Sequence, residues 1–219
     1  MAKIHSVEVL DDAISAEIAW RKQELTTALQ IIRQSSGNAR KANIRSGVLI
    51  LYAHWEGWVK GVAQLYIRYV NTQRYSYDKL SEAFLGNALK TRMNAIGEAS
   101  VPLVHNEFAL FIRTGLTGRA SLSESLVRTE SNLSSSIFLD IIHRLGLERR
   151  AQYLLRAQMI DQELVHRRNT IAHGQYLELG LDEFQVLRTS TMELLEIFTD
   201  DVRNAASTGA HLAIPMDQE

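Results

Sequence analysis

Apolar side chains recur every three or four residues along most of the chain, the spacing of a helix that buries one face. The first such segment predicts a helix from Val7 to Gln34, which Gly37 is placed to end. The period-two alternation typical of strands is not seen, and the only prolines are Pro102 and Pro215. The pattern therefore predicts an all-α protein. The apolar face of the first helix consists of Leu10, Ile14, Ile18, Leu25, Leu29 and Ile32.

A long helix is predicted over about residues 39–72, with Asn38 as its cap. This segment is apolar around most of its circumference, and glycines at 47, 57 and 61 let neighbouring helices approach closely. Its most apolar stretch, 49–70, contains four polar or charged side chains that would be costly in a bilayer: His54, Glu56, Lys60 and Arg68. We therefore interpret it as the buried central helix and predict no membrane association.

Shorter helices are predicted to follow the central one. Their approximate ranges are 79–96, 102–114 with a cap at Ser100, 134–145, 148–172 and 182–206. Residues 115–129 are rich in serine, threonine and glycine, and predict a loop that faces substrate or simply connects two helices. The organisation predicted is one domain over residues 1–206 and a frayed tail over 207–219.

Composition narrows the functional classes. Hydrophobic residues make up 46% of the 219 residues and charged residues 22%, as in ordinary globular proteins. The chain has no cysteine, which excludes disulfides and thiolate chemistry, and no export signal at its start, so we expect a cytoplasmic location. The net charge of −1 argues against bulk binding of nucleic acid. Positive charge is instead local, with six arginines between Arg144 and Arg168.

One arginine stands out in the string from Glu163 to Gly174. On a continuous helix Arg168 falls inside the apolar arc of its segment, where an unpaired guanidinium is costly. It therefore needs an anionic partner, a water-filled cleft or another subunit. The structural alternative is a buried ion pair, with Asp161 as the candidate on the same arc.

A polar seam follows the opposite edge of the same helix; its members are Gln162, His166, Asn169 and His173. Asn169 is one turn before His173 and could orient its ring. His173 is at the helix carboxyl end, where the macrodipole favours an imidazolium that can act as an acid. Arg168 and His173 are about 140° apart around the axis, so either the helix unwinds at its end or two chains share the site.

Two further residues are weaker candidates. Glu56, on the central helix, could neutralise Arg168 or tune His173, although a structural hydrogen bond is the interpretation we favour. His166 could support the site from the polar seam. His166 and His173 are about two turns apart with no third ligand nearby, so we expect neither a metal site nor a cofactor.

The string Arg168-Asn-Thr-Ile-Ala-His173 resembles the Arg-x4-6-His signature of the HEPN superfamily, with Asn169 as the polar residue after the arginine. The segments Tyr52-Ala-His-Trp-Glu-Gly-Trp-Val-Lys60 and Asn132-Leu-Ser-Ser are similar to the MAE-type branch, close to the RiboL-PSP HEPN proteins. The resemblance implies a HEPN-type helical bundle with a long central helix and additional short helices. Such domains form dimers through their signature helices.

The resemblance also implies a function, a metal-independent endoribonuclease that leaves 2′,3′-cyclic phosphate ends. His173 would then perform acid–base chemistry, Arg168 would contact the scissile phosphate of RNA and Asn169 would orient them. Toxin or phage-defence roles are implied, with an antitoxin or nucleotidyltransferase-like partner. Some HEPN toxins have a tyrosine two residues after the histidine, but Gln175 occupies that position here, before Tyr176. The alternatives are a non-enzymatic HEPN module that binds RNA, nucleotide or a partner, and a purely structural bundle.

Overall fold

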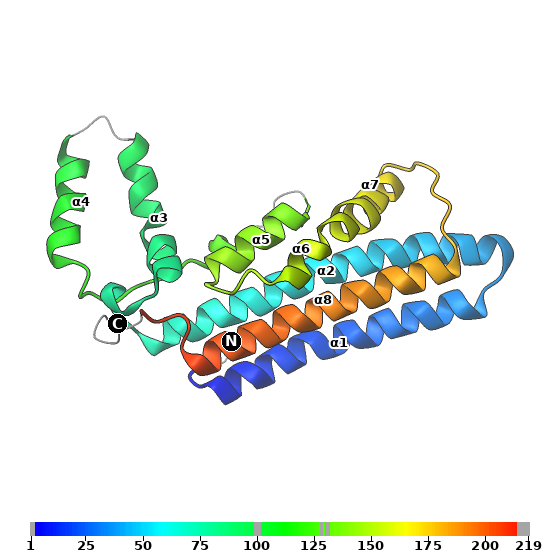
Figure 1. Cartoon of the computed structure of the whole chain (residues 1–219), viewed down its shortest axis with the longest axis horizontal. Coiled ribbons are helices and arrows are strands. Elements are labelled where there is room, and N and C mark those ends of the chain that lie inside the picture. Colours follow the sequence, from blue (N-terminus) through cyan, green and yellow to red (C-terminus); the bar gives the residue numbers. More distant parts are fainter. Residues whose placement is uncertain (1–2, 99–101, 128, 130–131, 214–219) are drawn as a thin grey trace.

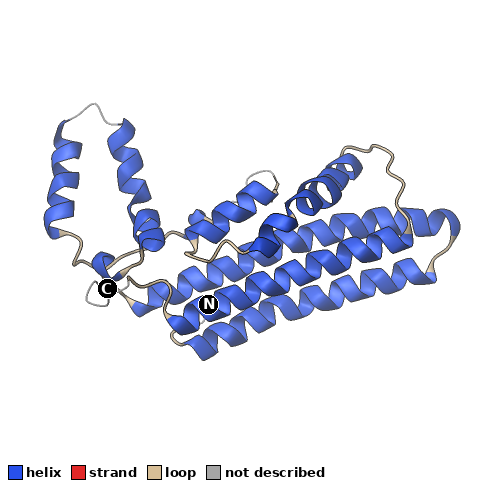
Figure 2. Cartoon of the chain, viewed as in Figure 1, coloured by secondary structure: helices blue, strands red, loops and turns tan. Residues whose placement is uncertain are grey.

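A computed structural model describes residues 3–98, 102–127, 129 and 132–213. Figures 1 and 2 show a helical molecule in which three long helices lie side by side. These are α1 (Val7–Gln34), α2 (Gly37–Gln73) and α8 (Leu181–Thr208). In the described residues, β-pairing is limited to the isolated bridges Ser76–Arg119 and Leu80–Leu212. The all-α prediction is confirmed.

The first helix follows its sequence pattern closely. It spans the predicted residues, and the hydroxyl of Ser6 accepts a hydrogen bond from the Val9 backbone N–H at 3.3 Å. All six predicted apolar positions are buried. The next helix begins at Gly37, with Ser36 as its N-cap, so the prediction of Asn38 as the cap is wrong. Gly37 has a positive φ of 55°, so the chain reverses within a very short link.

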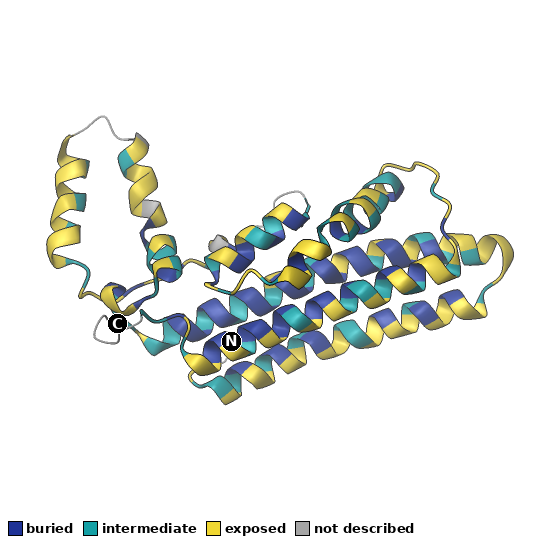
Figure 3. Ribbon diagram, in the orientation of Figure 1, coloured by how far each residue is buried: buried dark blue, intermediate teal, exposed yellow. Residues whose placement is uncertain are grey.

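The central helix α2 has the deepest burial, as Figure 3 shows. Trp55 and Trp58 are both fully buried. Their indole N–H groups remain satisfied, because Trp55 donates to the Leu133 carbonyl and Trp58 to the Thr199 hydroxyl, both at 2.9 Å. Because each N–H is hydrogen-bonded, burial of the two indole rings stabilises the folded protein. The predicted role of α2 as the core helix is confirmed.

A matched pair of glycine substitutions tests this packing. A Cβ on Gly47 would lie 2.8 Å from Ile32 Cδ1 and 2.9 Å from Phe184 Cζ, in the interior between α1 and α8. Gly47→Ala is therefore expected to lower the free energy of unfolding by about 1–3 kcal/mol. Gly86→Ala, in open space on α3, is expected to raise it by about 0.5–1 kcal/mol. Urea unfolding measures both, and a stabilised Gly47 variant would contradict the close approach.

Shorter helices occupy a second layer over α2, where they place the candidate site (Figure 1). This layer contains α5 (Ser135–Arg144), α6 (Ala151–Leu155), η3 (Met159–His166), which is a π-helix, and α7 (Arg167–Ala172). At the other end α3 (Glu82–Glu98) and α4 (Pro102–Thr114) form a projecting hairpin. Pro102 begins α4 as predicted, whereas the predicted cap at Ser100 is outside the described residues. The short turns η1 (Tyr77–Lys79) and η2 (Glu124–Leu126) flank this hairpin in sequence.

The predicted single helix over residues 148–172 is wrong, because the segment consists of three consecutive helices. Buried Asp201 of α8 pairs with Arg150 at 2.6 Å and accepts a hydrogen bond from the Tyr153 hydroxyl at 2.5 Å. These contacts fix α6 on α8, and the π-helix then adds residues per turn before α7 begins. The apolar spacing of Tyr153, Ile160 and Leu164 fits either kind of helix, so it could not reveal the change.

The described residues after α8, 209–213, are held in place. Gly209, with φ of 72°, ends that helix, and His211 is buried against Tyr66 and its aromatic neighbours. The His211 carbonyl accepts a hydrogen bond from the Ser81 backbone N–H at 2.9 Å. Residues 209–213, which we expected to fray, are thus packed, while 214–219 are outside the described part. Within the described residues, no helix combines the length and apolarity needed to cross a bilayer.

Candidate functional site

Arg168 lies in the first turn of α7 and faces α2. Its guanidinium is stacked on the ring of Tyr52, with Cζ 4.6 Å from the ring centre. Nη1 donates hydrogen bonds to Asn132 Oδ1 at 2.8 Å and to Asn169 Oδ1 at 2.7 Å. Among the described residues, no carboxylate forms an ion pair with Arg168, and its Nη2 and Nε have no hydrogen-bond partner. Among the described residues, neutral groups hold this charge in place.

Tyr52 supports this arrangement as a neutral ring. The side chain is buried, and its hydroxyl accepts a hydrogen bond from the Leu133 backbone N–H at 2.8 Å. Burial, with a smaller contribution from the Glu56 charge, raises the pKa of Tyr52 to about 12. The phenol therefore stays protonated near neutral pH, and its ring face attracts the cation without neutralising it.

The structural alternative considered from the sequence, an ion pair between Asp161 and Arg168, is not formed. Asp161 instead accepts hydrogen bonds from the backbone N–H of Ser135 at 2.8 Å and from its hydroxyl at 2.6 Å. Ser135 begins α5, where unpaired backbone N–H groups attract a carboxylate. The carboxylate thus stabilises the start of α5 and does not pair with Arg168.

Three neighbouring arginines differ from Arg168 because each forms an ion pair with a carboxylate. Arg167 pairs with Glu163 and lies 3.8 Å from Glu183, whereas Arg156 pairs with Glu193 at 2.9 Å. Much of the positive charge predicted for this segment is therefore neutralised locally, as it is at Arg150 on Asp201. Arg168 is half-buried, and among the described residues no carboxylate forms an ion pair with it.

Glu56 is one turn after Tyr52 on α2. Its carboxylate accepts a hydrogen bond from the Thr129 hydroxyl at 2.6 Å. This is the structural hydrogen bond that we favoured for it, and in the described part of the chain Glu56 forms no ion pair with Arg168. Any influence on the site is therefore indirect, through Tyr52.

His173 is exposed at the carboxyl end of α7. Its backbone N–H donates to the Asn169 carbonyl at 3.0 Å, so the helical turn persists as far as His173. Gly174, with φ of 74°, then reverses the chain. Because the helix does not unwind between Arg168 and His173, their side chains remain about 140° apart on one axis. One chain therefore directs the two groups to different sides.

The other predicted site residues can also be placed. His166 is exposed at the end of η3, and Asn169 uses its amide oxygen on Arg168 while its backbone holds His173. The sequence reasoning missed Asn132 and Tyr52 as partners of Arg168. Both lie in the segments that carried the family resemblance, which was the available signal. In the described residues, no group of three or more histidine, aspartate and glutamate side chains is arranged to hold a metal ion.

Comparison with protein families supports a relationship. A family model described as MAE_28990-like HEPN matches residues 10–209. No curated protein and no solved structure matches the chain. The matched range covers α2, α8, all but the first three residues of α1, and the whole of the candidate site.

Proposed function

The chain belongs to the MAE_28990-like HEPN family, as its resemblance to the MAE-type branch predicted, and from this premise we propose that it is a metal-independent endoribonuclease acting as a homodimer. The family establishes a HEPN-type domain. The reaction, the residues that perform it and the dimer are the proposal.

Arg168 is the observation that carries the proposal. A half-buried guanidinium whose described partners are all neutral retains its attraction for an anion, and a phosphodiester supplies one. Amide oxygens and the Tyr52 ring fix its position before substrate arrives. Such preorganisation stabilises charge that develops on a phosphate in the transition state.

The proposed reaction uses the 2′-hydroxyl of RNA as the nucleophile. A base removes the proton of that hydroxyl, whose oxygen attacks the adjacent phosphorus. The bond from phosphorus to the 5′-oxygen then breaks, and an acid protonates the leaving oxygen. The products are a 2′,3′-cyclic phosphate and a free 5′-hydroxyl. Arg168 stabilises the phosphorane between these steps.

A two-fold dimer provides the groups that one chain separates. The reaction needs a base, an acid and a cation, whereas one chain has a single signature His173 directed away from its own Arg168. Two copies related by a two-fold axis bring two histidines and two arginines to a shared site. In this arrangement Asn169 positions both groups, with His166 and Glu56 as supporting residues. The single HEPN domain over residues 1–206 is part of the same proposal.

The biological role proposed is that of a cytoplasmic toxin or phage-defence nuclease. RNA is the substrate, and an antitoxin or nucleotidyltransferase-like partner controls the activity. A neighbouring gene that encodes such a partner would support this role.

The test incubates the pure protein with mixed RNA in EDTA and assays the ends formed. Cyclic-phosphate ends from wild type, but not from the Arg168→Ala, His173→Ala double variant, are the expected result. Equal cleavage by both proteins refutes the proposal. RNA binding without cleavage, lost in Arg168→Ala, favours the second candidate, a non-enzymatic RNA-binding module, which the neutral surroundings of Arg168 would also suit.

A further inference from the structure

Tyr176 is an unusually exposed aromatic residue for this protein. It is 73% exposed, whereas Trp20, at 49%, is covered in part by Arg21 and His54. The other described phenylalanine, tyrosine and tryptophan side chains are buried or half-buried. Among described residues, no ring or cation is stacked on Tyr176. Both faces of its ring are therefore available to a ligand.

The backbone on either side of Tyr176 is anchored. The Gln175 carbonyl accepts a hydrogen bond from Arg45 Nη1 at 3.0 Å, and its N–H donates to the Thr170 carbonyl at 3.0 Å. On the other side Leu177 packs against the core and Leu179 is buried. The exposed ring is thus presented from a held segment.

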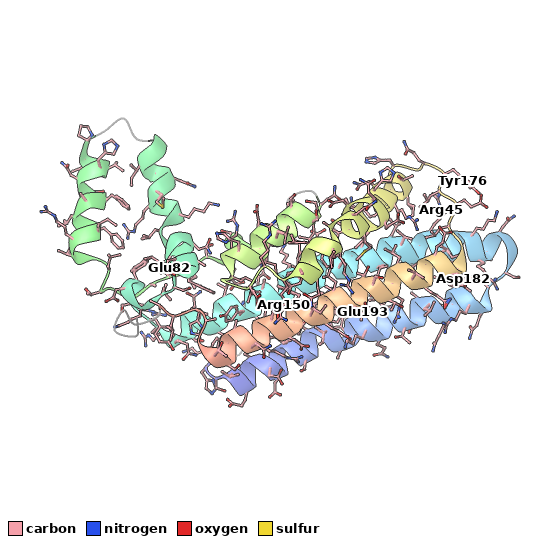
Figure 4. All side chains as sticks on the ribbon, in the orientation of Figure 1. Arg45, Glu82, Arg150, Tyr176, Asp182 and Glu193 are labelled. Atoms are coloured by element: carbon pink, nitrogen blue, oxygen red, sulfur yellow. The ribbon has the colours of Figure 1, made fainter. Side chains whose placement is uncertain are left out.

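Two cations from α2 lie beside this ring. Figure 4 shows Arg45 and Tyr176 next to each other at the end of the second layer. Arg45 forms no ion pair with the described carboxylates. Lys41 pairs with Glu178 at 3.2 Å, and the pKa of Lys41 is raised first by that carboxylate and then by Tyr176. Lys41 thereby neutralises the carboxylate, and Arg45 adds net positive charge.

Tyr176 and Arg45 lie close in the structure to the chain segment that follows His173, the proposed acid–base residue. Tyr176 is three residues beyond His173, and Gly174 begins the turn that joins them. Three residues span at most about 11 Å, so a nucleotide next to a phosphate bound at His173 is within reach of Tyr176. Unstacked bases bind to exposed aromatic faces, and arginine contacts the adjoining phosphate.

We infer that Tyr176 and Arg45 form a subsite for one unpaired nucleotide next to the scissile phosphate, so that the substrate is single-stranded RNA. The inference rests on the proposed function, because it takes His173 as the site of reaction. Tyr176 stacks on the base and Arg45 binds its phosphate. Any base can stack on the ring. The subsite therefore distinguishes single-stranded from double-stranded RNA and has little preference for a particular base.

The experiment measures binding of a fluorescein-labelled, mixed-sequence single-stranded RNA by anisotropy. All proteins carry His173→Ala to prevent cleavage. We expect Tyr176→Ala to weaken binding about 5- to 100-fold, because one stacking contact is lost. Tyr176→Phe, which keeps the ring, should bind within about twofold of its parent, as should Val186→Ala, an exposed apolar residue on α8. Arg45→Gln should reduce both affinity and its salt dependence.

A duplex of the same RNA provides the second arm. Because its bases are already stacked, Tyr176→Ala should leave duplex affinity unchanged. Equal single-strand binding by Tyr176→Ala and its parent overturns the subsite, even if wild type cleaves RNA. Conversely, wild type that fails to cleave single-stranded RNA in EDTA refutes the proposed function, whatever Tyr176 does to binding.

Discussion

Replacing His173 with alanine is expected to lower the rate of RNA cleavage about 100- to 10,000-fold, the usual contribution of a general acid or base. The side chain is exposed, so its loss should leave folding stability and RNA affinity nearly unchanged. Single-turnover cleavage measures the chemical step. His105→Ala, an exposed histidine on α4, is the matched control and should cleave like wild type.

Mixing wild-type protein with the His173→Ala variant tests whether two chains share one active site. If an active site needs His173 from both copies, only dimers of two wild-type chains cleave RNA. An equal mixture of wild type and His173→Ala, after subunit exchange, then contains one quarter active dimers. Independent sites would retain one half of the activity. A result of one half, or a monomer at the assay concentration, contradicts the composite site.

The long helices could be predicted because their information is local. The first helix has a capping serine at Ser6 and an uninterrupted apolar face, and α4 begins at Pro102 as its sequence indicates. The same reasoning gave a wrong prediction for residues 148–172, the segment that contains the candidate site. At α6, Arg150 and Tyr153 contact Asp201, about 50 positions away in the sequence, and the π-helix follows. The spacing of apolar residues in a helix does not reveal a contact between residues that are distant in the sequence.

The candidate site shows the same limit. A charge on an apolar arc identified Arg168 as exceptional from sequence alone, because burying it unpaired is costly. Its partners could not be predicted, since Asn132 and Tyr52 reach it through tertiary packing. Helix angles offered Asp161 only as the partner in the structural alternative, and that carboxylate accepts hydrogen bonds from Ser135 at the start of α5. Helix angles derived from the sequence can identify a charged residue on an apolar face, but they cannot identify the residue that it contacts.

Arg168→Lys is expected to lower cleavage about 100- to 1,000-fold while retaining most RNA affinity. Lysine keeps the positive charge but replaces the planar group that stacks on Tyr52 and is fixed by two amide oxygens. A mobile ammonium attracts the phosphate without holding it in the geometry of the phosphorane. The loss should therefore appear in the single-turnover rate rather than in the dissociation constant.

The adjacent residue supplies the control for this substitution. Arg167 has its charge paired with Glu163, an interaction that lysine can also make on one helix face. Arg167→Lys should consequently change cleavage less than about tenfold, because the paired charge contributes little to a phosphate beyond that ion pair. Equal losses in the two variants would show that general positive charge is what matters. A larger loss at Arg168 alone would mean that its fixed orientation on Tyr52 and Asn132 stabilises the transition state.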